Sequence, residues 1–244
     1  MNFDLEEHLR KEHKRTAFSQ YLREIVYGGN DGIVTTFAVV AGFAGAQRDP
    51  ATSAVPVVSV LLFGLANLFA DGLSMSLGSF LSIRADQDVY RNERAKEHHE
   101  IIHSTQSEFD ETVEILKRQK FGEADAQAIA KLYQKNETYW TEFMMTDELQ
   151  MTNPENEKPV SIALATFGAF IFFGFIPLVP YVLRLKQGNL FEISVLFTAA
   201  ALIFLGFFRA IVARQRMLRG IIETLIVGGS AAGVAYLVGS FFRI

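Results

Sequence analysis

Carboxylate and thioether side chains gather in one polar stretch of the chain. Two glutamate pairs with the spacing Glu-x2-Glu stand seven residues apart, and two methionines and a further glutamate follow them. Residues at positions i and i+3 are neighbours on a helix surface, so each pair presents two carboxylates together. Carboxylates attract divalent cations, and thioether sulfur favours a transition metal over calcium or magnesium. The pattern predicts a metal site formed by Glu97, Glu100, Glu108, Glu111, Met144, Met145 and Glu148.

A solvated charged surface is the alternative interpretation of this stretch, because most glutamate-rich helices are of that kind. Residues 86–157 hold 17 Asp and Glu against 8 Lys and Arg, which gives a net charge of −9 in a chain whose net charge is −4. Such a stretch concentrates cations and repels nucleic acid. His98, His99 and His103 lie beside the first glutamate pair as second-tier candidate ligands, although histidines are common on protein surfaces. The spacing alone leaves both interpretations open.

Long apolar segments on both sides of this stretch place the chain among membrane proteins. Half of the residues are hydrophobic, and 22 of them are Phe. A bilayer core about 30 Å thick requires roughly 20 mostly apolar residues per helix. Five segments meet that length, and the third holds no charged residue, which disfavours a buried helix of a soluble protein. The five segments are residues 25–46, 54–83, 159–183, 191–212 and 221–242.

The predicted fold class is an all-α membrane protein with five transmembrane helices and a cytosolic three-helix metal-binding insert. Four parts follow along the chain: an amphipathic lead-in (1–24), transmembrane helices one and two (25–83), the insert (84–158) and transmembrane helices three to five (159–244). Within the insert we expect the second span to continue through Glu100, a helix over 108–120, and a helix over 123–150 that ends before Pro154. Pro177 and Pro180 are expected to kink or end the third span.

Lys and Arg are unevenly distributed around the apolar segments, and cytosolic flanks carry the excess. They are frequent in the N-terminal flank and after the fourth span, and sparser near Arg48 and near Arg184. This predicts a cytosolic N-terminus and insert, with the C-terminus on the opposite side. Nothing resembles a cleaved signal peptide, and the short N-terminus favours a bacterial inner membrane. The basic residues in question are Arg10, Lys11, Lys14, Arg15 and Arg23, and then Arg209, Arg214, Arg216 and Arg219.

Polar residues inside the first two apolar segments predict an ion path. Asp31 stands among glycines in the first segment, where a carboxylate is costly and is a functional candidate by default. The alternative is that Asp31 caps a helix at the membrane surface. Asn67, Asp71 and Met75 have the spacing i, i+4, i+8 and share one stripe of a helix. Met75 alone would more often fill a core, but its register with the two polar residues favours a path.

The chain resembles the vacuolar iron transporter family from about residue 20 to the C-terminus. The resemblance rests on the segments GGNDGIVTTFAVVAGFAGA and ADGLSMSLGSFLS, on the four glutamates and on MMTDE. It implies five spans per subunit, a homodimer with the ion path between its subunits, and a cytosolic metal-binding domain. It also implies transport of Fe²⁺, with related divalent metals, out of the cytosol in exchange for protons. The same glutamate and methionine ligands would also bind Mn²⁺, Co²⁺ or Zn²⁺.

Carried over residue by residue, the resemblance assigns Asp31 and Met75 to the path and the seven residues of the polar stretch to the domain site. Asn67 stands where plant-like members have a second path glutamate. Its amide oxygen can bind a cation, but an amide cannot carry a proton. Asp71, one turn away, is the candidate substitute, so proton coupling is the open point of the resemblance.

The predicted function is therefore divalent-metal export by proton antiport, with no enzymatic activity and no prosthetic group. A metal-regulated channel is one alternative and predicts flux that is independent of a pH gradient. A membrane metal sensor or store is another and predicts binding without flux. An intramembrane aspartyl protease is disfavoured because the residues before Asp31 lack the Gly-x-Gly-Asp order. The predicted partners are metal ions, protons, the bilayer and a second copy of the chain, without nucleic acid. The absence of cysteine excludes disulfides and thiolate metal sites.

Overall fold

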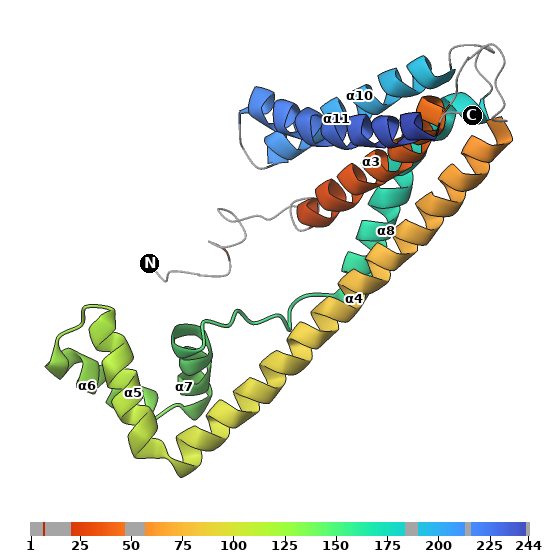
Figure 1. The fold of residues 1–244 in the computed structure, drawn as a ribbon. Coiled ribbons are helices and arrows are strands. Elements are labelled where there is room, and N and C mark those ends of the chain that lie inside the picture. Colours follow the sequence, from red (N-terminus) through yellow and green to blue (C-terminus); the bar gives the residue numbers. More distant parts are fainter. Residues whose placement is uncertain (1–6, 8–20, 47–56, 184–189, 213–215, 243–244) are drawn as a thin grey trace. The chain divides into compact units, whose positions relative to one another are not determined.

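A computed structural model describes residues 7, 21–46, 57–183, 190–212 and 216–242, and the elements in these ranges are all helical (Figure 1). The chain forms two compact units, residues 1–79 with 160–244 and residues 80–159. Helix α4 (Val57–His103) contributes to both units because it runs through the boundary at residue 79. Most of the predicted lead-in (1–24) and most of the basic residues that predict the orientation lie outside the described ranges.

The first unit holds helices long and apolar enough to cross a membrane. Four such helices are found in the described ranges, and their composition makes the chain an integral membrane protein. They are α4, the run from Pro159 to Val182, α10 (Leu190–Val212) and α11 (Met217–Phe241). The second run consists of α8 (Pro159–Phe175), the 3₁₀ turn η2 (Ile176–Leu178) and α9 (Val179–Val182).

The change from α-helix to 3₁₀ turn falls where the two prolines lie. Pro177 is in η2 and Pro180 is in α9. Proline lacks the backbone N–H that an α-helix interior requires, so the prediction of an interrupted third span is confirmed.

Helix α3 (Leu22–Ala46) covers the first predicted span but is not among the four helices above. Its 25 residues exceed the length that a bilayer requires. The three glycines, Asn30 and Asp31 of its Gly-Gly-Asn-Asp-Gly sequence lower its mean hydropathy. The all-helical membrane fold is thus confirmed, and the count of five spans stays a prediction.

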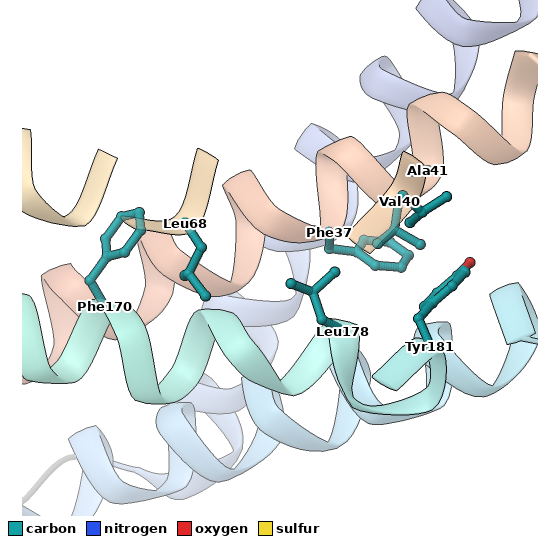
Figure 2. Close-up of a cluster of buried hydrophobic side chains, with 8 residues drawn as sticks. Phe37, Val40, Ala41, Leu68, Phe170, Leu178 and Tyr181 are labelled. Atoms are coloured by element: carbon teal, nitrogen blue, oxygen red, sulfur yellow. The ribbon is translucent and has the colours of Figure 1, made fainter. Parts of the chain in front are cut away.

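Small residues bring α3 close to its neighbours in the first unit. A Cβ atom added to Gly32 would collide with the backbone of Phe170 in α8, and one added to Gly239 in α11 would collide with the backbone of Gly42. Glycine is required at such positions because helix axes approach closely only where side chains are absent. A cluster of buried apolar side chains lies beside these contacts (Figure 2). It includes Phe37, Val40, Ala41, Leu68, Phe170, Leu178 and Tyr181.

The second unit consists of the charged part of α4 and four shorter elements. These are α5 (Thr105–Arg118), α6 (Glu123–Tyr133), α7 (Glu137–Phe143) and the π-helix η1 (Met144–Glu148). Their apolar sides enclose a small core that includes Ile101, Leu116, Ala126, Ala130, Trp140 and Met144.

The prediction of one continuous helix over 123–150 is wrong. The helix breaks after Tyr133, and Asn136 caps a new helix by accepting a hydrogen bond from the Tyr139 backbone N–H at 3.1 Å. Asparagine is among the preferred N-cap residues, because its side-chain oxygen satisfies an N–H that the helix leaves unpaired. The break redirects the chain so that Trp140 and Phe143 reach the core.

Candidate metal centre

Three glutamates from three elements of the second unit converge. Glu97 comes from the charged part of α4, Glu108 from the first turn of α5 and Glu148 from the end of η1. One carboxylate oxygen from each lies within 4.8 Å of the other two. Oxygens bound to a single divalent ion at about 2.2 Å are roughly 3–4 Å apart, so a small closure would complete the geometry. We call these three residues the carboxylate centre.

Burial sets this group apart from an ordinary acidic surface. Glu97 is 3% exposed and Glu108 is 5% exposed, whereas Glu148 is exposed. The Oε2 atom of Glu108 is buried and has no hydrogen-bond partner among the described residues. A buried carboxylate oxygen without a partner is costly, because the charge loses its hydration and gains nothing in return. A bound cation is the partner that this arrangement fits.

The carboxylates also repel one another. Burial raises the pKa of Glu97 to about 7, and repulsion from Glu148 and Glu100 adds to the increase. Burial likewise raises the pKa of Glu108 to about 7, with Glu111 as the strongest repelling neighbour. Partial desolvation of its carboxylate raises the pKa of the more exposed Glu148, and repulsion from Glu111 and Glu100 adds to the increase. A divalent cation would remove this repulsion and favour the charged forms.

All five predicted glutamates therefore interact electrostatically. Glu100 and Glu111 lie outside the carboxylate centre, but their charges repel its three carboxylates and raise the pKa values of those groups. Glu111 accepts a hydrogen bond from the Ser107 hydroxyl at 3.4 Å. The sequence pattern of two i, i+3 pairs was the signal for this grouping, since it places both pairs on helix faces that can meet.

The two predicted methionine ligands lie in the π-helix η1. Both side chains are completely buried. The Met144 sulfur is 3.5 Å from the Thr112 hydroxyl, and this hydroxyl also accepts a hydrogen bond from the Trp140 indole N–H at 2.7 Å. Thr112 follows Glu108 by one turn and donates to its backbone carbonyl at 2.8 Å. These contacts place Met144 next to the helix that carries Glu108.

The π-helix was not predicted, and nothing in the sequence MMTDE indicates it. Short π-helical segments are rare in proteins overall, and those that occur are often found at functional sites. Here the wider turn carries both methionines, and Glu148 is its last residue.

A hydrogen-bonded group that the sequence analysis missed connects α4 to α7. The Tyr90 hydroxyl donates to Oε2 of Glu142 at 2.8 Å, and Nε of Arg94 donates to Oε1 of the same carboxylate at 2.6 Å. Tyr90 is 1% exposed. Glu142 precedes Met144 by two residues, so this group holds the end of α7 where η1 begins. Only the tertiary contact distinguishes Glu142 from the other glutamates of the sequence.

The predicted path residues lie on α3 and α4 within the first unit. Asn67 donates a hydrogen bond from Nδ2 to Oδ2 of Asp71 at 2.7 Å, and Asp71 interacts electrostatically with Asp31. A Cβ atom on Gly28 would lie 3.4 Å from the terminal methyl carbon of Met75. The structure therefore brings the polar stripe of α4 to the glycine-rich part of α3.

Glu24 is a further residue of α3 that the sequence analysis did not single out. Its Oε2 atom is buried, with no hydrogen-bond partner in the described part of the chain. The spacing i, i+4 puts Glu24 on the same face of α3 as Gly28. The available signal was an acidic residue in the first turn of a mostly apolar helix.

Membrane-spanning helices and a partly buried carboxylate group together define an integral membrane protein with a candidate cation site. The sequence comparisons make the assignment specific. Residues 22–240 match the sequence profile of the VIT family, and the chain belongs to this family.

Curated relatives match over most of their length. The vacuolar iron transporter of Toxoplasma gondii is 32% identical over 243 residues, which is 96% of this chain and 78% of the relative. Vacuolar iron transporter 1 of Arabidopsis thaliana is 31% identical over 91% of this chain and 86% of its own. Vacuolar iron transporter 2 of Oryza sativa subsp. japonica is 31% identical, with 93% and 91% covered. The resemblance to the vacuolar iron transporter family is thus confirmed.

Proposed function

We propose that this protein is a divalent-metal transporter that moves Fe²⁺ out of the cytosol in exchange for protons. The observation that carries the proposal is the carboxylate centre, with its buried, unpartnered oxygen on Glu108. The relatives above are named as iron transporters, which supports iron as the cargo. Mn²⁺, Co²⁺ and Zn²⁺ suit the same oxygen and sulfur ligands and are further candidate substrates.

In the proposed topology α3 is the first of five spans, and the N-terminus and residues 84–158 face the cytosol of a bacterium. Residues 84–158 then form a cytosolic metal-binding domain, and the C-terminus lies across the inner membrane. The subunit acts as a homodimer. The homodimer and the membrane location are supported by the apolar surface of α4. Leu62, Leu73 and Leu77 are each more than half exposed there, and they can contact lipid or a second copy of the chain.

In the proposed mechanism the glutamates of the second unit capture the cation, and Met144 and Met145 contribute sulfur that discriminates against Mg²⁺ and Ca²⁺. The cation then passes Asp31 and Met75 in the first unit. Release follows when Asp31 takes a proton on the far side, because a protonated carboxyl no longer holds the ion.

Asp71 is the proposed second proton carrier in this mechanism. Asn67 cannot take that role, but its amide N–H holds Asp71 by the hydrogen bond described above. A proton on Asp71 would also reduce its repulsion of Asp31.

The test is Fe²⁺ flux into proteoliposomes that contain a metal-quenched dye, with and without an imposed pH gradient. We expect flux that depends on the gradient and that is lost in Asp31→Asn. Glu192→Gln is the matched control, because Glu192 is an exposed carboxylate of the first unit outside the proposed path. Gradient-independent flux would support the channel alternative, and metal binding without flux would support a sensor or store. Full flux in Asp31→Asn would remove Asp31 from the path.

A further inference from the structure

The end of α4 carries a second set of metal-binding side chains. Residues 99–103 read His-Glu-Ile-Ile-His, which is the spacing H-E-x-x-H. On a helix this spacing places two imidazoles one turn apart on the same face, where they can hold one metal ion together. The carboxylate centre includes neither histidine.

The two imidazoles are already adjacent. The ring centroids of His99 and His103 are 3.9 Å apart, and the ring planes differ by 26°. Both side chains are exposed. Nδ1 of His103 lies 2.9 Å from the backbone carbonyl oxygen of His99. A carbonyl only accepts, so this nitrogen is the donor, and the neutral imidazole with this tautomer presents the lone pair of Nε2 to a metal.

The histidine pair lies on a different face of α4 from the carboxylate centre. At 100° per residue, His99 and His103 are roughly 120–160° around the helix from Glu97. Glu97 is 3% exposed and faces the core of the second unit, whereas the histidines face solvent. Glu100 stands between the two histidines in the sequence but interacts electrostatically with Glu97 and Glu148. We therefore assign Glu100 to the glutamates around the carboxylate centre and not to the histidine pair.

The local charge favours a cation at the pair. His103 is the last residue of α4, and the C-terminal end of a helix carries a partial negative charge. Residues 86–157 have a net charge of −9. The positive charge of Lys96 opposes this attraction of a cation, because Lys96 is exposed and lies one turn before His99 on the same side of the helix.

We propose that His99 and His103 form a second metal site, open to solvent, for a borderline transition metal such as Zn²⁺, Ni²⁺, Cu²⁺ or Co²⁺. Imidazole nitrogen suits these ions. Among the described residues no third His, Asp or Glu groups with the pair, so water completes the coordination. The site does not depend on the proposed transport, because it uses neither the carboxylate centre nor the path.

The test measures Zn²⁺ binding to the full-length protein in detergent by equilibrium dialysis. Glu97→Gln with Glu108→Gln is the background, because it removes two of the three closest carboxylates. We expect this background to retain one Zn²⁺ per chain and to lose it when His99→Gln and His103→Gln are added. His98→Gln is the matched control, since His98 is an exposed neighbour that lies 3.3 Å from the Thr141 hydroxyl instead. We expect it to retain the ion.

The identity of the ligands is tested separately with Cu²⁺. Electron paramagnetic resonance of the same background should show hyperfine coupling to two nitrogens, which is lost in the double histidine variant. A background that binds no Zn²⁺, or a double histidine variant that keeps both the ion and the nitrogen coupling, would overturn the proposal. Circular dichroism of each variant checks the fold, and His103→Gln alone provides a second, milder change. Fe²⁺ flux is not a readout here, so the proposed function and this site can fail independently.

Discussion

At the scale of single residues, the raised pKa values of Glu97 and Glu108 link stability to pH. Both are about 7, against an ordinary value of 4.5. Between these values the folded protein binds more protons than the unfolded chain, so its stability falls as pH rises through this window. We expect the metal-free protein to unfold more easily at pH 8 than at pH 5.5. Chemical denaturation in the presence of a chelator, followed by fluorescence of Trp140, measures this difference; Trp140 is the only tryptophan of the sequence.

Added Mn²⁺ should reverse this trend, because the cation binds the deprotonated carboxylates and its affinity rises with pH. The variant with Glu97→Gln and Glu108→Gln should show little dependence on pH and little response to Mn²⁺. Stability that increases with pH in the absence of metal would contradict the assignment of these two carboxylates.

The sequence predicted this group of carboxylates because its information is local: two i, i+3 pairs of glutamates and a fifth glutamate close to two methionines. It did not reveal Tyr90, Arg94 or Glu24, because the roles of these residues arise from contacts with other elements or from burial. Nothing in the residue type distinguishes Glu142 from Glu155, which accepts from Arg91 on the exposed surface. Burial and tertiary contacts separate such cases.

At the scale of elements, Glu142 should matter for the position of η1. We expect Glu142→Gln to destabilise the second unit by about 1–3 kcal/mol, because it weakens two hydrogen bonds to one carboxylate and leaves Arg94 without its charge partner. Metal affinity should also fall, since the end of α7 then holds Met144 less firmly. Glu155→Gln is the matched control, because its ion pair with Arg91 is exposed and worth less than about 1 kcal/mol. Denaturation and Mn²⁺ titration of both variants check the difference, and equal effects would contradict it.

Helix packing in the first unit allows a second prediction at this scale. Gly32→Ala should destabilise the fold by about 1–3 kcal/mol, because its Cβ would overlap the backbone of Phe170, which cannot move aside as a side chain can. Gly168→Ala is the control within the same helix packing, since its Cβ would have no neighbour within 4 Å. Thermal unfolding in detergent measures both variants. A tolerated Gly32→Ala with a damaged Gly168→Ala would contradict this packing.

The elements themselves were predictable where a single pattern decides them. Apolar length predicted the four helices of membrane-spanning length, and the prolines predicted an interruption of the third span, which the structure shows as a 3₁₀ turn at Pro177. The break between α6 and α7 and the π-helix η1 were not predictable in the same way. They depend on the cap at Asn136 and on the seating of Trp140 and Met144 in a small core, which the helical periodicity of the sequence does not encode.

At the scale of the whole molecule, the two polar groups lie in different units: the carboxylate centre in residues 80–159, and Asp31 with Asp71 in the other unit. If capture and passage are separate steps, their variants should differ in kinetics. We expect Glu97→Gln with Glu108→Gln to reduce Fe²⁺ flux at low Fe²⁺ and to approach the parent rate at saturation, because only capture is weakened. Asp31→Asn should stay slow at every concentration, because no excess of cargo restores a missing path ligand. Initial rates in proteoliposomes over a range of Fe²⁺ concentrations separate a higher KM from a lower maximal rate. A double glutamate variant that remains slow at saturation would show that the second unit takes part in passage as well as capture.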